Sequence, residues 1–202
     1  MSNDRYNNFS ELKNNETEGI DYIIRYQNKM TKWAVLTPHG GGIEPGTSEL
    51  VKAIANDNYS YYSLEGTKRK NNGDLHITSE FFDEIHGIEI AESAENILAF
   101  HGCAKYPSKI LVGGLDIKNR ALLTALLQQA GFNVDNNPPP ELSGSKPNNI
   151  CNRGKTGIGI QLELDVTVRK KLFKGLDRKG RIEKMPAFYD LVKAVKEFLK
   201  KS

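Results

Sequence analysis

The chain has 202 residues, of which 38% are hydrophobic and 26% are charged, the balance of a folded, water-soluble protein. Its 28 lysines and arginines exceed its 25 aspartates and glutamates by a net charge of only +3, which argues against a nucleic-acid partner. No stretch approaches the roughly 18 consecutive apolar residues of a membrane span. Residues 1–15 lack the apolar run of a secretory signal, so we expect cytoplasmic synthesis and no membrane partner.

Short apolar and aromatic runs alternate with helical patterns along the chain. After a polar lead-in over residues 1–20, the runs Tyr22–Tyr26 and Trp33–Thr37 predict two strands. A loop rich in glycine follows, and then Thr47–Ile54 has the hydroxyl cap and apolar spacing of a helix. The later predicted elements are a strand at Tyr59–Leu64, a helix at Phe81–Ala94, a strand at Asn96–Phe100, a helix at Asn119–Ala130 closed by Gly131, a strand at Gly157–Val168 and an amphipathic helix at Met185–Lys200.

This alternation predicts the α/β class. We expect one domain over residues 1–202, built on an open mixed, partly parallel sheet with helices on both faces. A long loop rich in proline and asparagine interrupts the pattern at residues 136–149.

Two histidines occupy equivalent places in this pattern. His39 and His101 each close a predicted strand, His39 after Pro38 and His101 directly after Phe100, and each is followed by glycine. Because ligands of open α/β sheets bind beyond the carboxyl ends of the strands, both imidazoles are expected in one cleft. Glu44 lies across a glycine-rich loop that can fold back toward His39. Two histidines and a carboxylate are a ligand set of catalytic zinc, although strand-end histidines with glycines that serve turns give the same spacing.

A carboxylate interrupts an apolar run near residue 160. In the predicted strand, alternation places Gln161, Glu163 and Asp165 on one face. If that face lines the cleft, Glu163 is placed to act as general base on a metal-activated water. An edge strand with one solvated face explains the pattern equally well.

Other polar residues have weaker signals. Arg153, with Asn152 before it, has the guanidinium chemistry that binds carboxylates, but taken alone it is better explained as a surface arginine. His76 is either a contact to substrate or a structural residue near a strand start, and His86 is expected at the surface.

The two cysteines, Cys103 and Cys151, allow at most one disulfide bridge. We expect two unbridged thiols, although a bridge, or Cys103 as a soft competing metal ligand, also fits the sequence. A basic cluster has the pattern of a solvated face, or of a surface that steers an acidic polymer; it comprises Arg169, Lys170, Lys171, Lys174, Arg178, Lys179 and Arg181.

Six separated motifs together resemble one known family. The segments TPHGGGIEPGTSEL, LHITSEFFDE, FHGC, LVGGLD, NICNRGKTGIGIQLEL and LFKGLDRKGR are similar, in this order, to the poly-γ-glutamate hydrolases of bacilli and their phages. That family is itself similar to the zinc carboxypeptidases, which implies a carboxypeptidase-like core.

The resemblance implies a zinc-dependent endopeptidase that cuts γ-glutamyl amide bonds of poly-γ-glutamate. It implies one zinc ion per chain, held by His39, Glu44 and His101, with Glu163 as catalytic base. Arg153 and Asn152 match the Asn-Arg pair with which carboxypeptidases bind a substrate carboxylate, so Arg153 is expected to hold a free α-carboxylate of the polymer or, as a catalytic residue, to stabilise the oxyanion. Carboxypeptidases separate their first histidine and glutamate by two residues, whereas four intervene here, as in the hydrolase family.

Two other functions remain open at this point. One is a metal-dependent amidase or peptidase that acts on a different acidic or cell-wall peptide, and the other is a non-catalytic polymer-binding module. A monomer is expected, and an enzyme without a signal would reach extracellular polymer after lysis.

Overall fold

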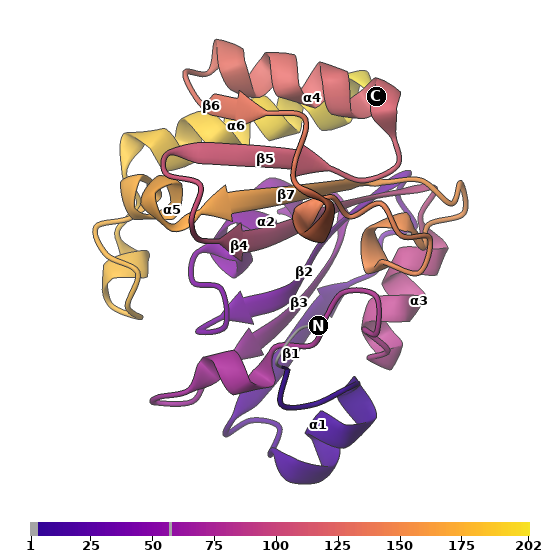
Figure 1. Ribbon diagram of the computed structural model, residues 1–202, viewed down its shortest axis with the longest axis vertical. Helices are drawn as coiled ribbons and strands as arrows, with labels where there is room; N and C mark the ends of the chain where they lie inside the picture. Colours follow the sequence, from indigo (N-terminus) through magenta and orange to yellow (C-terminus); the bar gives the residue numbers. More distant parts are fainter. Residues whose placement is uncertain (1–3, 57) are drawn as a thin grey trace.

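A computed structural model describes residues 4–56 and 58–202, which form one mixed, seven-stranded sheet. The strand order is β1-β3-β2-β4-β7-β5-β6, which Figure 1 shows from β1 near the bottom to β6 near the top. The four central strands β3, β2, β4 and β7 are parallel, whereas β1 and β5 run antiparallel to β3 and β7. The strands are β1 (Tyr22–Gln27), β2 (Trp33–Gly41), β3 (Ser60–Gly66), β4 (Asn96–Cys103), β5 (Lys109–Gly113), β6 (Asn133–Asp135) and β7 (Ile160–Asp165). The sheet confirms the predicted open, partly parallel α/β architecture.

Helices cover both faces of the sheet, and each face has its own apolar core. Along β2, Trp33 and Val35 enter the core beneath α2, α4, α5 and α6, while Ala34 and Leu36 enter the core on the side of α1 and α3. Burial on both faces explains why the strand is a continuous apolar run. The helices are α1 (Phe9–Asn15), α2 (Thr47–Ala55), α3 (Ile85–Ser93), α4 (Ile117–Gln129), α5 (Val166–Leu172) and α6 (Pro186–Lys201). Of the helices in the described ranges, none has the length and apolarity needed to cross a bilayer.

Side-chain caps shift two predicted boundaries. The strand expected to reach Val168 ends at Asp165, whose carboxylate accepts a hydrogen bond from the Thr167 backbone N–H and starts α5. The helix expected from Phe81 begins only at Ile85, because Glu84 caps it. In both places a local cap outweighs the propensity of the flanking residues. Strands β5 and β6 and helices α1 and α5 were absent from the sequence prediction.

The polar lead-in is partly folded. Within residues 1–20, of which 1–3 lie outside the described residues, α1 buries Phe9 and Leu12 against the sheet. Asn8 caps this helix by accepting a hydrogen bond from the Glu11 backbone N–H.

Helix α2 starts without the predicted hydroxyl cap. Its N-cap residue is Gly46, at a φ of 106° that favours glycine, and a Cβ there would lie 2.8 Å from the Phe173 ring. The hydroxyl of Thr47 instead donates to the Glu44 carbonyl, 2.9 Å away. The start of α2 therefore orders the loop that carries Glu44.

Strands β2 and β4 separate at their carboxyl ends. Their pairing runs from Trp33–Leu36 against Asn96–Ala99 and goes no further, and the register of β2 with β3 shifts between Thr37 and Gly40. Such a bulge re-aims the side chains at a strand end. After β2 the chain continues to β3 on one side of this pair, and after β4 it continues to β5 on the other side. Ligands of open α/β sheets usually bind at such a point, and the crevice forms there.

Candidate metal centre and active site

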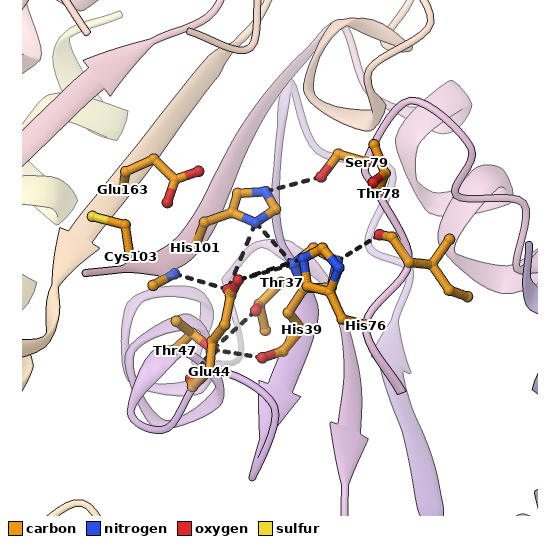
Figure 2. A network of polar contacts seen from close by, with 12 residues as sticks. Thr37, His39, Glu44, Thr47, His76, Thr78, Ser79, His101, Cys103 and Glu163 are labelled. Carbon is orange, nitrogen blue, oxygen red and sulfur yellow. Dashed lines mark hydrogen bonds and ion pairs between the residues drawn. The ribbon is translucent and has the colours of Figure 1, made fainter. Parts of the chain in front are cut away.

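His39 on β2 and His101 on β4 meet in this crevice. Their side chains are buried, and their Nδ1 atoms lie 3.1 Å apart (Figure 2). His39 Nε2 lies 2.7 Å from the Ile77 carbonyl oxygen, which can only accept a hydrogen bond. In the neutral imidazole Nε2 therefore carries the proton, and Nδ1 presents its lone pair to the crevice.

Glu44 completes a cluster of three donors. The loop folds back through a hydrogen bond from the Glu44 backbone N–H to the His39 carbonyl, 2.9 Å long. Glu44 Oε1 lies 3.2 Å from His39 Nδ1, and Oε2 lies 3.7 Å from His101 Nδ1. One ligand atom from each residue lies within 4.8 Å of the others. Two imidazole nitrogens and one carboxylate that converge in this way are compatible with a metal site.

The Glu44 carboxylate is held in its ionised form. Burial alone would raise its pKa, but the charge of His39 and hydrogen bonds to both histidines outweigh burial, so the pKa is lowered from its usual range. The Gly102 backbone N–H also donates to Glu44 Oε2 over 2.8 Å. An ionised carboxylate is the form that binds a cation.

Glu163 lies beside this cluster on β7. It is the direct register neighbour of His101 in the parallel pair β4–β7, so the two side chains share one face of the sheet. Figure 2 shows it on the far side of His101 from His76. Burial, followed by the nearby charge of Glu44, raises its pKa well above the usual value. Gln161 Nε2 donates to Glu163 Oε1 over 3.0 Å and orients the carboxyl group.

The cluster opens into a pocket of about 760 Å³. The predicted alternation on β7 holds at this point, since Ile160, Leu162 and Leu164 enter the core while Gln161 and Glu163 line the pocket. The other walls are residues 78–81, residues 102–106 and residues 140–146. The last of these segments belongs to the loop rich in proline and asparagine, so this loop forms one side of the site.

His76 also reaches the pocket. It follows the 3-10 helix η1 (Asn72–Leu75) rather than starting a strand, and its ring lies against that of His39 with centroids 3.9 Å apart. Its Nδ1 lies 2.7 Å from Asp4 Oδ1, so the N-terminal segment fixes the orientation of the ring. The positive field of His39, with burial second, lowers the pKa of His76.

Comparison with known proteins identifies the family. The model of the poly-gamma-glutamate hydrolase family matches residues 6–194. The chain belongs to the poly-gamma-glutamate hydrolase family. This membership confirms the resemblance inferred from the six motifs.

Relatives of this hydrolase family share both sequence and fold. The UPF0714 protein YndL of Bacillus subtilis (strain 168) is 40% identical over 98% of this chain and 79% of its own length, and the zinc-free structure of YndL has a TM-score of 0.92. A bacteriophage poly-gamma-glutamate hydrolase is 31% identical, with a TM-score of 0.94 over 98% of this chain and 97% of its own. A putative carboxypeptidase from Burkholderia mallei, 11% identical with a TM-score of 0.51 over 90% of this chain and 60% of its own, confirms the carboxypeptidase-like fold alone.

In this member of the hydrolase family, Asn152 and Arg153 lie outside the pocket. The Arg153 guanidinium is paired with Glu92 at 3.1 Å and is absent from the pocket lining formed by the described residues. Both the oxygen and the nitrogen of the Asn152 amide form hydrogen bonds with backbone groups. Its oxygen accepts hydrogen bonds from Leu115 and Gly159, and its nitrogen donates to Gly144 and Lys146. The substrate contact expected of this pair stays a prediction, and in this structure the Asn152 amide holds the backbone of the pocket wall at Gly144 and Lys146.

The cysteines are unbridged, as expected. Both are buried, and burial raises the pKa of Cys103 to about 12, with the charge of Glu163 as the second cause. Burial likewise raises the pKa of Cys151. A neutral thiol is a poor metal ligand, and the three-donor cluster does not include Cys103.

The basic cluster predicted to form a solvated face is exposed only in part. Lys170, Lys171, Lys174, Arg178 and Lys179 are exposed. Arg169 and Arg181, however, are only 6% and 7% exposed, so neither belongs to a solvated surface. Sequence reasoning missed both arginines because they stand among exposed lysines. It also missed Asp4, which three strands and two α-helices separate from His76 in the chain.

Proposed function

We propose that this protein is a zinc-dependent endopeptidase that hydrolyses γ-glutamyl amide bonds of poly-γ-glutamate. The observation that carries the proposal is the cluster of His39, Glu44 and His101 in a pocket that also contains Glu163. Family membership supports the substrate, and the bacteriophage relative is itself a poly-gamma-glutamate hydrolase.

The donor set fits one zinc ion per chain. His39 Nδ1, His101 Nδ1 and a Glu44 oxygen would hold the ion, and the Ile77 carbonyl would keep the His39 lone pair aimed at it. When bound, zinc supplies Lewis-acid chemistry that polarises the scissile carbonyl and makes a water molecule more acidic.

Glu163 is the proposed general base. Its carboxylate accepts a proton from the attacking water and then donates that proton to the leaving amine nitrogen. The hydrogen bond from Gln161 directs the Glu163 carboxyl group for both transfers. A raised pKa suits this double role, because the group must bind and release one proton in a single turnover.

Three side chains of the pocket are proposed to contact the polymer. His76 lines the pocket on the opposite side of His101 from Glu163, and its Nε2 lies 3.9 Å from Glu44 Oε1. Lys105 and Lys146 line the pocket, are exposed, and form no ion pair with another described residue. Ammonium groups in these positions would attract the free α-carboxylates of the polymer, as the resemblance implies for Arg153.

The test is polymer degradation followed by size-exclusion chromatography. Protein loaded with zinc should shorten γ-linked polyglutamate, and chelator-treated protein should not. Polyglutamate with α-linked bonds is the matched control and should remain intact. Cleavage of the α-linked polymer or of cell-wall peptide alone would support the alternative amidase, and binding without cleavage at any zinc concentration would support a polymer-binding module.

A further inference from the structure

Arg169 lies beneath the candidate metal centre. It is the fourth residue of α5, and its side chain is buried although its neighbours Lys170 and Lys171 are exposed. A buried guanidinium is costly unless its N–H groups find acceptors, so the identity of those acceptors is informative.

The Arg169 guanidinium donates to backbone carbonyls of three separate segments. Nη1 donates to Pro45, Nη2 to Cys103 and Nε to Leu164, each over 3.1 Å. Pro45 follows Glu44, Cys103 lies two residues after His101, and Leu164 follows Glu163. One rigid, planar fork therefore joins the loop and the two strand ends that carry two metal-binding side chains and the proposed base.

Gly102 shows how closely this fork packs against the centre. A Cβ at Gly102 would lie 2.6 Å from the guanidinium carbon of Arg169, and the Gly102 backbone N–H donates to Glu44. The pKa of Glu163 is raised by burial and by the charge of Glu44, and the positive charge of Arg169 opposes this rise. Arg169 thus contacts the backbone of the site and acts on its charges, while it stays out of the pocket lining.

We propose that Arg169 is a positioning residue that holds the Glu44 loop and the ends of β4 and β7 in the arrangement needed to bind the metal and orient Glu163. The catalytic part of this inference rests on the proposed function, whereas the metal-binding part does not require the substrate to be known.

Arg181 provides a matched control. It is buried to nearly the same extent, forms an ion pair with Glu49 at 2.8 Å and donates to the Leu176 carbonyl, but none of these partners belongs to the site. Substitution of either arginine is expected to lower the stability of the protein, but only substitution of Arg169 is expected to change the metal centre. Comparison of the two variants therefore separates the two effects.

The experiment compares Arg169→Met, Arg169→Lys and Arg181→Met with the wild type. Zinc affinity is measured by competition with a chelator of known affinity, and the thermal midpoint is measured on the metal-free proteins. We expect both Arg169 variants to lose about 10–100-fold in zinc affinity, as is usual when support of metal ligands is removed, and kcat to fall more than KM changes. Arg181→Met should keep the zinc affinity of the wild type, although its thermal midpoint should fall about as much as that of Arg169→Met.

Gly102→Ala tests the same contact if Arg169→Met does not fold. The added methyl group would displace the guanidinium of Arg169 by steric contact, while every hydrogen-bonding group remains. This variant should also bind zinc more weakly than the wild type.

Wild-type zinc affinity in Arg169→Lys and Gly102→Ala would overturn the inference, and so would an equal loss of zinc affinity in Arg181→Met. A wild-type chain that binds no zinc would instead overturn the proposed function together with the metal-binding part of the inference, and zinc binding without polymer cleavage would overturn the activity alone.

Discussion

A backbone carbonyl determines which nitrogen of His39 faces the candidate metal centre. Since Ile77 accepts the Nε2 proton, the ring presents Nδ1, and the Nδ1 of His101 faces it across 3.1 Å. The Glu44 carboxylate lies within 3.7 Å of both Nδ1 atoms, and its lowered pKa keeps it ionised. At the scale of single residues, hydrogen bonds select the tautomer of His39 and favour the ionised form of Glu44.

The first prediction concerns the general base. Glu163→Gln keeps the shape of the side chain and its contact with Gln161 but removes the proton acceptor. We expect kcat to fall by about 10²–10⁴-fold while zinc content stays near that of the wild type. The measurements are steady-state kinetics on the γ-linked polymer and elemental analysis of the purified protein.

Glu197→Gln is the matched control, since Glu197 is paired with Lys201 on α6 and lies away from the pocket. It should retain wild-type kcat. Full activity in Glu163→Gln would exclude this residue as the base.

The second prediction concerns His76. Its Nε2 faces the pocket, and we expect His76→Ala to lower kcat/KM by about 10–100-fold through the loss of a polar contact to the substrate. Zinc affinity should change little, because His76 is not one of the three clustered donors. Kinetics and zinc titration on the same sample distinguish these effects, and loss of zinc with unchanged kcat per bound zinc would contradict the proposed contact.

At the scale of elements, the site depends on where strands stop pairing. The bulge in β2 and the early end of its pairing with β4 open the crevice, while the continued pairing of β4 with β7 keeps His101 and Glu163 adjacent. The N-terminal segment contributes too, since Asp4 orients His76 and α1 packs against the sheet. Directly after α1, Glu16 accepts hydrogen bonds from Lys68 and Tyr6, both 2.7 Å long.

The third prediction concerns the pH dependence of this attachment. Burial alone would raise the pKa of Glu16, but the hydrogen bonds from Lys68 and Tyr6 outweigh burial and lower the pKa below the ordinary 4.5. A carboxyl group with a lowered folded-state pKa stabilises the protein above its unfolded-state pKa, and this stabilisation is lost as the pH falls through the folded-state value.

Glu16→Gln should therefore reduce the free energy of unfolding by about 1–3 kcal/mol at pH 7. The difference from the wild type should shrink as the pH falls below about 4.5. Urea unfolding of both proteins between pH 7 and pH 3 measures this difference, and a difference independent of pH would show that the Glu16 charge is not responsible.

At the scale of the whole molecule, the candidate ligands come from two different strands and the loop between β2 and α2. His39 and His101 lie 62 residues apart in the chain, and their convergence requires the folded sheet. A metal held by these residues binds the folded chain in preference to the unfolded one, so it should stabilise the entire protein.

The fourth prediction follows from this linkage. Free zinc at about 100 times its dissociation constant should add about 2.7 kcal/mol to the free energy of unfolding, a rise of about 5–10 °C in Tm for a chain of this size. Differential scanning calorimetry with zinc and with chelator provides the measurement. His101→Ala should show no zinc-dependent rise, and an equal rise in this variant would place the zinc elsewhere.

The sequence by itself determined the fold class and predicted the residues of the candidate metal site. Alternation reveals buried strands, and their carboxyl ends mark the crevice, which indicated a shared cleft for His39 and His101, while the resemblance to the hydrolase family implied the full set with Glu44. Short caps such as Asp165 were the main cause of misplaced boundaries, since one side chain outweighs several weak propensities.

Only the tertiary structure decided the roles of residues whose partners are distant in the chain. Arg153 has the chemistry of a carboxylate-binding residue, yet it forms an ion pair with Glu92 and does not line the pocket formed by the described residues. Arg169 is surrounded by lysines in the sequence, yet it is buried against carbonyls of three segments. The physical reason is the same in both cases: burial and hydrogen-bond partners depend on contacts across the folded chain, and local sequence patterns do not specify those contacts.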